Sequence, residues 1–390
     1  MSTQIAAILP QDVEQANLVG RVWVPGHGPV PVAVRDDDLI NLSGEAITMS
    51  ALLDLANPAE AIVASQGTVV SSLEEALAAG ASQDRAKPHL LAPCDLQAIK
   101  AAGVTFAESL VERVIEERAQ GDPAAAQAIR AELSDSIGAD LSRIRPGSEE
   151  AAALKAALIE RGLWSQYLEV GIGPDAEVFT KAQPMSVVGH GAQIGIHPKS
   201  VWNNPEPEVV LACNSRGQAV GATLGNDVNL RDFEGRSALL LGKAKDNNAS
   251  CAIGPFIRLF DDAFGIDDVR AAQVALEVRG AEDGFVMHGR SDMSRISRDP
   301  LDLVGQACGA NHQYPDGFML FLGTLFAPTQ DRDEPGQGFT HKIGDTVEIS
   351  SPRLGTLTNE VTTSDEASPW TYGVGALVQD LLRRPKEDRA

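Results

Sequence analysis

Hydrophobic and polar residues alternate with a period of two in the first part of the chain, which predicts β-structure there. Residues 19–40 follow this pattern and break at Pro-Gly and Gly-Pro pairs, as short antiparallel strands joined by tight turns do. Two short helices should follow over residues 50–56 and 73–79, the second begun by a Ser-x-x-Glu capping sequence at Ser72. Residues 1–92 are therefore predicted to form a small N-terminal α+β domain.

A helical period of 3.6 residues replaces this alternation between about residues 106 and 162. One apolar stripe is made by Leu110, Val111, Val114 and Ile115. Gly-Asp-Pro at 121–123 interrupts the pattern, a second helix is expected over 124–133, and a third should begin at Ser148 and stop at Gly162. We interpret this helical insertion as a lid that closes over a substrate and excludes water.

Beyond Trp164 the pattern is mainly that of strands and glycine turns, up to a last helix over 374–383. Many non-local strands with glycine-rich turns favour a mixed β-roll over parallel βαβ units. Neither a Gly-x-Gly-x-x-Gly dinucleotide motif nor a phosphate-binding loop occurs. The predicted fold class is therefore α+β, with a mixed β-roll core in a second domain over 93–390. Two domains also suit a chain of 390 residues.

Charge and cysteine content narrow the choice of partner and compartment. A net charge of -22 argues against nucleic acid or an anionic membrane surface as the main partner. No apolar run approaches the length of a membrane span, and the N-terminus lacks the basic and apolar regions of a signal peptide, so we expect a cytoplasmic protein. Four scattered cysteines without a Cys-x-x-Cys pair are expected to be buried, reduced thiols.

Glu206 and Glu208 stand one residue apart at the start of an apolar stretch, so they would share one face of an extended strand. Two like charges at such positions repel each other and destabilise the strand. A divalent cation would remove this penalty, because hard oxygen ligands that converge on one point suit Mg²⁺ or Mn²⁺. The alternative is a solvated, acidic start of a strand.

Further candidates for metal-binding and substrate-binding residues lie downstream of Glu208 in the sequence. A strand ending at Leu224 and a turn over the next two residues would present Asp227 from a loop, either as a third metal ligand or as a turn or N-cap residue. Lys243 is a solvated lysine, a cation aimed at the carboxylate of a bound acid, or a proton carrier. Arg290 and Ser291 either hold the distal groups of a substrate or belong to a surface loop.

The order and spacing of these motifs resemble the fumarylacetoacetate hydrolase family. The family pattern is a Glu-x-Glu strand, an Asn-Asp-x-x-x-Arg-Asp segment, Gly-Lys-x-x-Asp and Gly-Pro. The corresponding stretches here are 206–208, 226–232, 242–246 and 254–255, with Phe179-Thr180-Lys181 upstream and Gly323-Thr324 downstream. The resemblance extends over roughly residues 100–362.

The resemblance implies that Glu206, Glu208 and Asp227 bind one Mg²⁺ or Mn²⁺ ion. The residues that would contact or surround a bound 2-oxo acid are Lys243, Thr324, Lys181 and Arg231. Of these, the first two would contact its carboxylate, Lys181 would lie just behind them and Arg231 near the site. Members of the family are commonly homodimers or dimers of dimers, so a homodimer or homotetramer is expected.

The resemblance also bears on which of two reactions the protein catalyses, hydrolysis or dehydration. Hydrolase members carry a helix reading roughly Asn-Tyr-x-x-His-x-x-Glu, in which the histidine and the glutamate activate water. The matching stretch here is 105–112, where Ser109 replaces the histidine and Glu112 keeps the acid. Without the histidine, a water nucleophile for carbon–carbon cleavage is harder to generate at neutral pH. Hydrolysis of a 2,4-diketo acid, such as fumarylpyruvate or an acylpyruvate, is the alternative function.

Residues 179–181, 188–191 and 202–208 look most like the branch that dehydrates 2-keto-3-deoxy sugar acids. Coordination of the C2 ketone and C1 carboxylate by a metal ion acidifies the C3 proton. Glu112 could take that proton or give one to the departing C4 hydroxyl, with Ser109 or a water molecule orienting it. A five-carbon substrate of the xylonate or arabinonate type would give 2-oxoglutarate semialdehyde, which implies a place in oxidative pentose catabolism.

Overall fold

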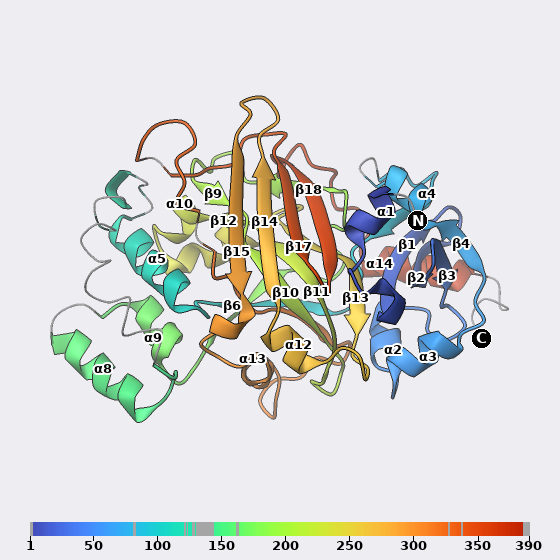
Figure 1. Ribbon diagram of the computed structural model, residues 1–390, viewed down its shortest axis with the longest axis horizontal. Helices are drawn as coiled ribbons and strands as arrows, with labels where there is room; N and C mark the ends of the chain where they lie inside the picture. Colours follow the sequence, from blue (N-terminus) through green and yellow to red (C-terminus); the bar gives the residue numbers. More distant parts are fainter. Residues whose placement is uncertain are drawn as a thin grey trace.

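The computed structural model of the protein describes residues 3–80, 83–120, 122, 124–126, 129, 144–160, 164–326, 328–336 and 338–384. Its described elements form a large sheet, a smaller sheet packed against it and helices around both (Figure 1).

The large sheet contains eleven strands among the described residues. In order across the sheet, ten of them are β4 (Val69–Ser72), β3 (Asp38–Asn41), β2 (Gly28–Arg35), β1 (Leu18–Val24), β13 (Cys251–Leu259), β11 (Ala219–Asp227), β10 (Pro207–Cys213), β16 (Phe318–Phe321), β6 (Ala98–Gly103) and β7 (Glu177–Ala182). The remaining strand, β5 (His89–Leu91), pairs with β1. Neighbouring strands are antiparallel except β16 and β6, which are parallel.

The second sheet has five strands among the described residues. Their order is β15 (Val286–Asp292), β14 (Gln273–Arg279), β17 (Thr346–Ser351), β18 (Gly355–Thr363) and β8 (Gln193–Ile196). Only the β18–β8 pair is parallel within this sheet as described. A short separate pair joins β9 (Asn203–Asn204) to β12 (Asn229–Leu230). The predicted α+β class with mixed sheets is confirmed.

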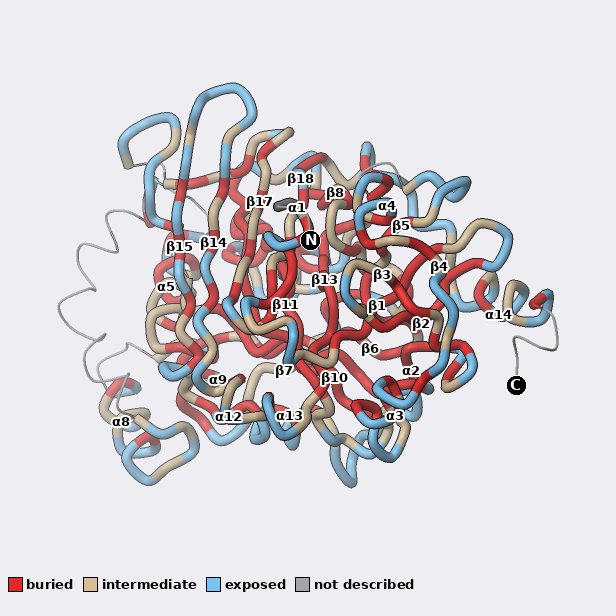
Figure 2. Tube along the Cα trace, turned by 45° about the vertical axis from the view of Figure 1, so that its right-hand side comes forward, coloured by how far each residue is buried: buried red, intermediate tan, exposed pale blue. Residues whose placement is uncertain are grey.

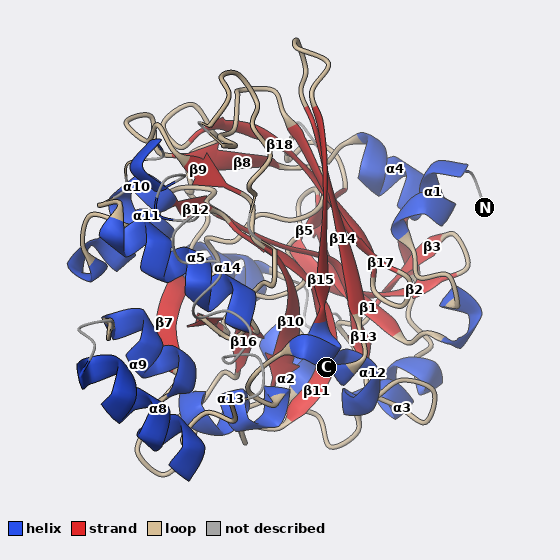
Figure 3. Cartoon of the chain, turned by 60° about the vertical axis from the view of Figure 1, so that its left-hand side comes forward, coloured by secondary structure: helices blue, strands red, loops and turns tan. Residues whose placement is uncertain are grey.

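Helices cover the ends and flanks of the sheets. The described helices are α1 (Thr3–Ile8), α2 (Met49–Leu53), α3 (Pro58–Ala64), α4 (Leu73–Ala78), α5 (Ala107–Arg118), α8 (Glu149–Glu160), α9 (Gln166–Ile172), α10 (Arg231–Glu234), α11 (Leu241–Lys245), α12 (Ile266–Arg270), α13 (Pro300–Ala307) and α14 (Val374–Arg383), with 3-10 turns η1 (Val13–Gln15), η2 (Ala238–Leu240) and η3 (Met293–Arg295). Figure 3 shows α8 and α9 together below α5, on the side of the molecule that also carries α10 and α11.

The main core lies between the two sheets. Strand β10 is buried along its whole length, and its alternate side chains enter two different cores. Val209 and Leu211 pack in the core that also contains Leu276 and Ile349 of the second sheet. Val210 belongs to the core on the other face, which includes residues of α2. Figure 2 shows this buried interior running through β10, β11 and β13, so the middle of the large sheet is a rigid support.

The N-terminal part behaves largely as its pattern predicts. Strands β1 to β3 form an antiparallel meander, and Ser72 caps α4 by accepting a hydrogen bond from the Glu75 amide at 3.2 Å. Helix α2 is shorter than the predicted span of 50–56. The meander is not a sheet of its own, because Leu18 and Val19 of β1 pair with β13 of the main sheet. The division into domains at residue 92 stays a prediction.

The helical predictions are confirmed where they can be compared. Leu110, Val114 and Ile115 of α5 are buried in one cluster, and the Ser148 hydroxyl caps α8. The last helix has the predicted bounds of 374–383. The predicted break at 121–123, most of the predicted helix over 124–133 and the predicted stop at Gly162 lie outside the described residues.

No helix within the described residues is long and apolar enough to cross a bilayer.

Candidate metal and substrate site

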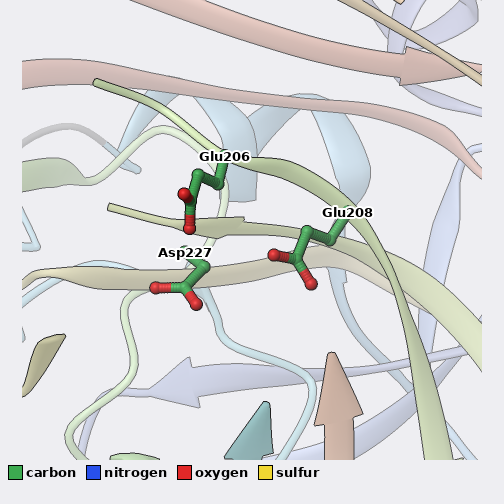
Figure 4. Close-up of side chains that lie close together, drawn as sticks. All are labelled: Glu206, Glu208 and Asp227. Atoms are coloured by element: carbon green, nitrogen blue, oxygen red, sulfur yellow. The ribbon is translucent and has the colours of Figure 1, made fainter. Parts of the chain in front are cut away.

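Three acidic side chains converge where β10 and β11 lie side by side. Glu206 precedes β10, Glu208 lies within it, and Asp227 ends β11, with its amide donating a hydrogen bond to the Glu206 carbonyl at 3.0 Å. Each offers a carboxylate oxygen, and these oxygens lie within 4.8 Å of one another. Figure 4 shows the three carboxylates leaning toward one another. We call these three residues the acidic triad.

The predicted loop position of Asp227 is wrong. Gly225 and Asn226 belong to β11 and pair with both β10 and β13, so the strand continues to Asp227. A side chain at Gly225 would meet Phe321 at 2.3 Å and Val210 at 2.6 Å, so the glycine serves close packing inside the sheet and not a turn.

The triad is removed from water. Glu206, Glu208 and Asp227 are 5%, 3% and 2% exposed. Burial first, and then the charges of Asp227 and Glu206, hold the pKa of Glu208 well above its usual value. The recorded hydrogen-bond donor to Glu208 is the Gly323 amide at 2.6 Å, and no cation pairs with this carboxylate among the described residues.

Two buried lysines form ion pairs with the other two carboxylates of the triad, Glu206 and Asp227. Lys245 Nζ lies 2.6 Å from Glu206 Oε2 and 3.1 Å from Asp227 Oδ1, and Lys181 Nζ lies 3.0 Å from Asp227 Oδ1. Burial opposes ionisation of Asp227, but Lys181 and Lys245 outweigh it and lower the pKa of this carboxyl. Burial also opposes the charge on Lys245, yet Asp227 and Glu206 raise its pKa. Lys181 also donates to the Val228 and Lys245 carbonyls, which fixes its position.

One face of α5 completes the surroundings. Arg113 forms ion pairs with Glu206, with Glu116 at 2.8 Å and with Glu234 at 3.0 Å. Arg231 is held by Glu116 at 2.6 Å and by Glu112 at 3.4 Å. The guanidinium of Arg231 also stacks over the Trp202 ring at 4.2 Å.

Two narrow cavities meet at this charged cluster. One, of about 30 Å³, borders the triad and Lys245. The other, of about 20 Å³, borders Glu112 and Arg231. Four residues line both cavities and therefore lie between them: Ser109, Arg113, Glu206 and Thr324. Each cavity has room for an ion or a water molecule but not for a sugar acid, so substrate entry requires movement of the surroundings. No histidine lines either cavity within the described part of the chain.

Three of the residues predicted to contact a substrate do not line the cavities at the triad. Lys243 is exposed, and its Nζ is 3.3 Å from Nε2 of His197 and not at the triad, so the predicted place of Lys243 is wrong. Arg290 is exposed and lines a cavity beside α1 and β17. Ser291 is buried, and its hydroxyl accepts a hydrogen bond from the Leu325 amide at 3.1 Å, one residue beyond Thr324. Ser291 therefore supports the segment that carries Thr324 and lines neither cavity at the triad.

The sequence patterns did not single out four residues that the structure places at the site. These are Arg113, Glu177, Glu234 and Lys245. Ser109, Glu112, Arg113 and Glu116 occupy positions i, i+3, i+4 and i+7 of α5. This polar stripe runs along α5 beside the apolar stripe, and the pattern could have indicated that the helix faces a charged site. Burial first, and then the charge of Glu234, raise the pKa of Glu177 to about 7.

The donor set fits a hard divalent cation. Three convergent carboxylates in a buried place repel one another, and no cationic side chain among the described residues forms an ion pair with Glu208. Oxygen-only ligands of this kind suit Mg²⁺ or Mn²⁺ better than the softer metals, which favour sulfur or imidazole. Burial and the repulsion from Asp227 and Glu206 raise the pKa of Glu208, and a bound cation of charge two would offset that repulsion.

Comparison with known proteins agrees with this fold. The family described as fumarylacetoacetate (FAA) hydrolase C-terminal matches residues 166–362, which include the whole triad. The chain belongs to this family of enzymes.

Two relatives have more specific names. The chain is 32% identical over 205 residues to the probable 2-keto-3-deoxyxylonate dehydratase of Haloferax volcanii, covering 52% of this chain and 66% of the relative. It is 31% identical over 185 residues to the 2-dehydro-3-deoxy-D-arabinonate dehydratase of Saccharolobus solfataricus, covering 47% of this chain and 58% of the relative. The matches thus span less than two thirds of either relative.

A solved structure shares the fold over most of the chain. It is described as 2-keto-3-deoxy-D-arabinonate dehydratase complexed with magnesium and 2,5-dioxopentanoate, with a TM-score of 0.62 and 21% identity, covering 89% of this chain and 99% of that one.

Proposed function

We propose that the protein is a Mg²⁺-dependent dehydratase of a 2-keto-3-deoxy sugar acid, of pentonate length. The observation that carries the proposal is the convergence of three buried carboxylates within the part of the chain that matches the family. The dehydratase names of both relatives support the reaction, and the magnesium and 2,5-dioxopentanoate in the similar structure support the metal and the product.

The acidic triad would hold the metal ion, with Mn²⁺ as a substitute. Such an ion supplies Lewis-acid chemistry, because it stabilises the negative charge that develops on a 2-oxo acid when its C3 proton leaves. Lys245 pairs with Glu206 and Asp227, and Lys181 pairs with Asp227, which orients both carboxylates as ligands. Thr324, which lines both cavities, would donate a hydrogen bond to the substrate carboxylate.

Glu112 and Ser109 would handle the proton at C3 and the departing hydroxyl at C4. Both line the cavity beside the triad, one helical turn apart on α5. Arg231 lies 3.4 Å from Glu112 and keeps this carboxylate in place. With no histidine among the described residues that line the cavities, carboxylates are left to carry protons, which suits elimination of water better than activation of water for hydrolysis.

A two-substrate assay tests the function. The protein is incubated with Mg²⁺ and either 2-keto-3-deoxy-D-xylonate or 2-keto-3-deoxy-D-arabinonate, and separately with an acylpyruvate. We expect a semialdehyde from a sugar acid, lost with EDTA and restored by Mg²⁺. Pyruvate from the diketo acid without any semialdehyde would establish the carbon–carbon hydrolase instead. Pentose catabolism, a cytoplasmic location and a homodimer or homotetramer stay predictions.

A further inference from the structure

A second, larger cavity lies apart from the acidic triad, at the junction of the N-terminal strands and the C-terminal segment. Its volume is about 450 Å³, within the range of small-molecule sites. It shares no lining residue with the cavities at the triad. Figure 1 places α14, which follows the C-terminal part of the lining, beside β1 and β2 at the end of the molecule away from α5.

One residue that lines this cavity is a buried arginine. Arg21, on β1, is 4% exposed. Its Nε donates to the Ala92 carbonyl at 3.1 Å, and one terminal nitrogen contacts the sulfur of Met185 at 3.4 Å. Among the described residues no carboxylate forms an ion pair with Arg21. A guanidinium has five N–H donors, so most of them have no oxygen partner from the protein.

A buried guanidinium without an ion-pair partner destabilises the folded protein unless an anion binds to it. The guanidinium fork matches a carboxylate with two parallel hydrogen bonds, which makes an anion with two coplanar oxygens its natural partner. The protein as a whole carries a net charge of -22, so an unpaired cation facing a cavity is unusual against that background. The charged residues that line the cavity are Arg21, Arg85 and Asp84, a local excess of one positive charge.

The wall above Arg21 is aromatic. Trp23, two residues along β1, lies edge-on to Tyr372 with ring centres 5.3 Å apart and is stacked with His89. Arg85 at the exposed rim lies over the Trp23 ring at 5.0 Å and over Tyr372 at 5.3 Å. Burial lowers the pKa of His89, so at neutral pH this ring is an uncharged part of the wall. Flat rings around a single cation suit a ligand with a flat apolar body.

We propose that this cavity binds a small organic carboxylate with a planar apolar body, whose carboxylate pairs with Arg21 and whose body packs against Trp23 and Tyr372. The proposal does not depend on the reaction at the acidic triad. The site would serve an effector or a second ligand, since its lining is separate from the triad.

Benzoate is the probe, and benzamide is its neutral counterpart of the same shape. Binding is followed by tryptophan fluorescence, because Trp23 and Trp370 line the cavity, and by the melting temperature. EDTA is present throughout, so that benzoate cannot bind a metal ion at the triad. We expect saturable benzoate binding with Kd below about 1 mM, and benzamide binding at least about tenfold weaker.

Benzoate binding by substituted proteins tests whether the probe binds at Arg21 or at another site. Arg21→Met should lose benzoate binding, Arg21→Lys should retain part of it, and Arg290→Met, which removes an exposed arginine at another cavity, should bind as the wild type does. Glu206→Gln should also bind benzoate normally. Equal binding of benzoate and benzamide, normal benzoate binding by Arg21→Met, or a crystal structure that pairs Arg21 with a carboxylate of a second copy of the chain would each overturn the proposal. Should Arg21→Met not fold, the comparison of the two probes on the wild type decides alone.

Discussion

Lys245 and Lys243 point to opposite sides of α11, so that only Lys245 reaches the acidic triad. Lys245 Nζ is 2.6 Å from Glu206, whereas Lys243 is exposed beside His197. Successive residues of an α-helix are rotated by about 100°, so residues two apart face nearly opposite ways. The two lysines therefore form a matched pair, in which one touches the candidate site and the other does not.

Replacing Lys245 should impair the enzyme far more than replacing Lys243. Lys245→Met leaves the Glu206 carboxylate without its closest lysine and disturbs the geometry of the triad, so kcat/KM should fall at least about 100-fold. Lys243→Met should stay within about threefold of the wild type, as surface changes usually do. Steady-state kinetics of both variants in saturating Mg²⁺ measure this. A larger loss in Lys243→Met would restore the role that the family pattern gives to that residue.

A divalent cation should stabilise the folded protein through the triad. At a Mg²⁺ concentration about 100 times its Kd, linkage adds about 2.7 kcal/mol to the free energy of unfolding, because the unfolded chain lacks the site. The melting temperature of the wild type should therefore rise with Mg²⁺ and fall with EDTA. Glu206→Gln should lose this dependence.

Glu282→Gln is the matched control for that experiment, since it makes the same chemical change at an exposed turn. It should keep the full Mg²⁺ response. A wild-type melting temperature that ignores both Mg²⁺ and EDTA would remove the metal from the proposed function.

Much of the site could be read from sequence because Glu208 and Asp227 lie on regular strands and Glu206 directly precedes one. The alternation at Glu206 and Glu208 and the order of the motifs were sufficient to predict three convergent carboxylates, and the structure brings them within 4.8 Å. The position of Asp227 was mistaken because Gly-Asn is typical of a turn, whereas here the lack of a side chain at Gly225 lets Phe321 pack closely.

The other residues of the site could not be predicted from the sequence, because their positions depend on contacts between distant segments. Arg113 belongs to the site because α5 packs so that its polar stripe meets Glu206 and Glu234, more than ninety residues away in the chain. The short helix α11 decides which lysine of Gly-Lys-Ala-Lys is buried, and a motif match alone does not reveal the rotation of a helix. Likewise, Arg290 and Ser291 are neighbours in sequence, but alternation along β15 sends them to opposite faces.

Glu112 should prove necessary for turnover, and Ser109 helpful. If Glu112 carries the proton, Glu112→Gln keeps its shape but cannot exchange a proton, so kcat should fall at least about 100-fold. Ser109→Ala should cause a smaller loss, because the Ser109 hydroxyl donates to the Phe106 carbonyl at 2.9 Å and at most orients its neighbour. Glu108→Gln, one residue from Ser109 but paired with Arg295 at an exposed position, is the control. Turnover by Glu112→Gln close to that of the wild type would exclude Glu112 from the mechanism.

A separate buried ion pair contributes to the acid stability of the fold. Asp345 accepts two hydrogen bonds from Arg332, at 2.6 and 2.7 Å, and lies 3.1 Å from Nδ1 of His341. Burial opposes ionisation of Asp345, but the bonds from Arg332 and His341 lower its pKa to about 2 from an ordinary value of 3.8. The folded carboxyl thus holds its proton less tightly than the unfolded one, so this residue favours folding at every pH above its unfolded pKa.

Asp345→Asn should therefore destabilise the protein at neutral pH, by about 2–3 kcal/mol, because it removes a charged partner of the buried Arg332, which keeps its ion pair with Asp283 at 2.9 Å. The part of this stabilisation that comes from ionisation is about 2 kcal/mol, from the lowered pKa. That part is complete above about pH 4 and is lost as the pH falls through about 2, so the difference in unfolding free energy between wild type and variant should shrink over that interval.

Urea unfolding at a series of pH values measures this difference in the free energy of unfolding. Asp262→Asn, which changes an exposed aspartate, is the control. A difference that stays constant down to pH values near 2 would show that Asp345 is not held ionised by Arg332.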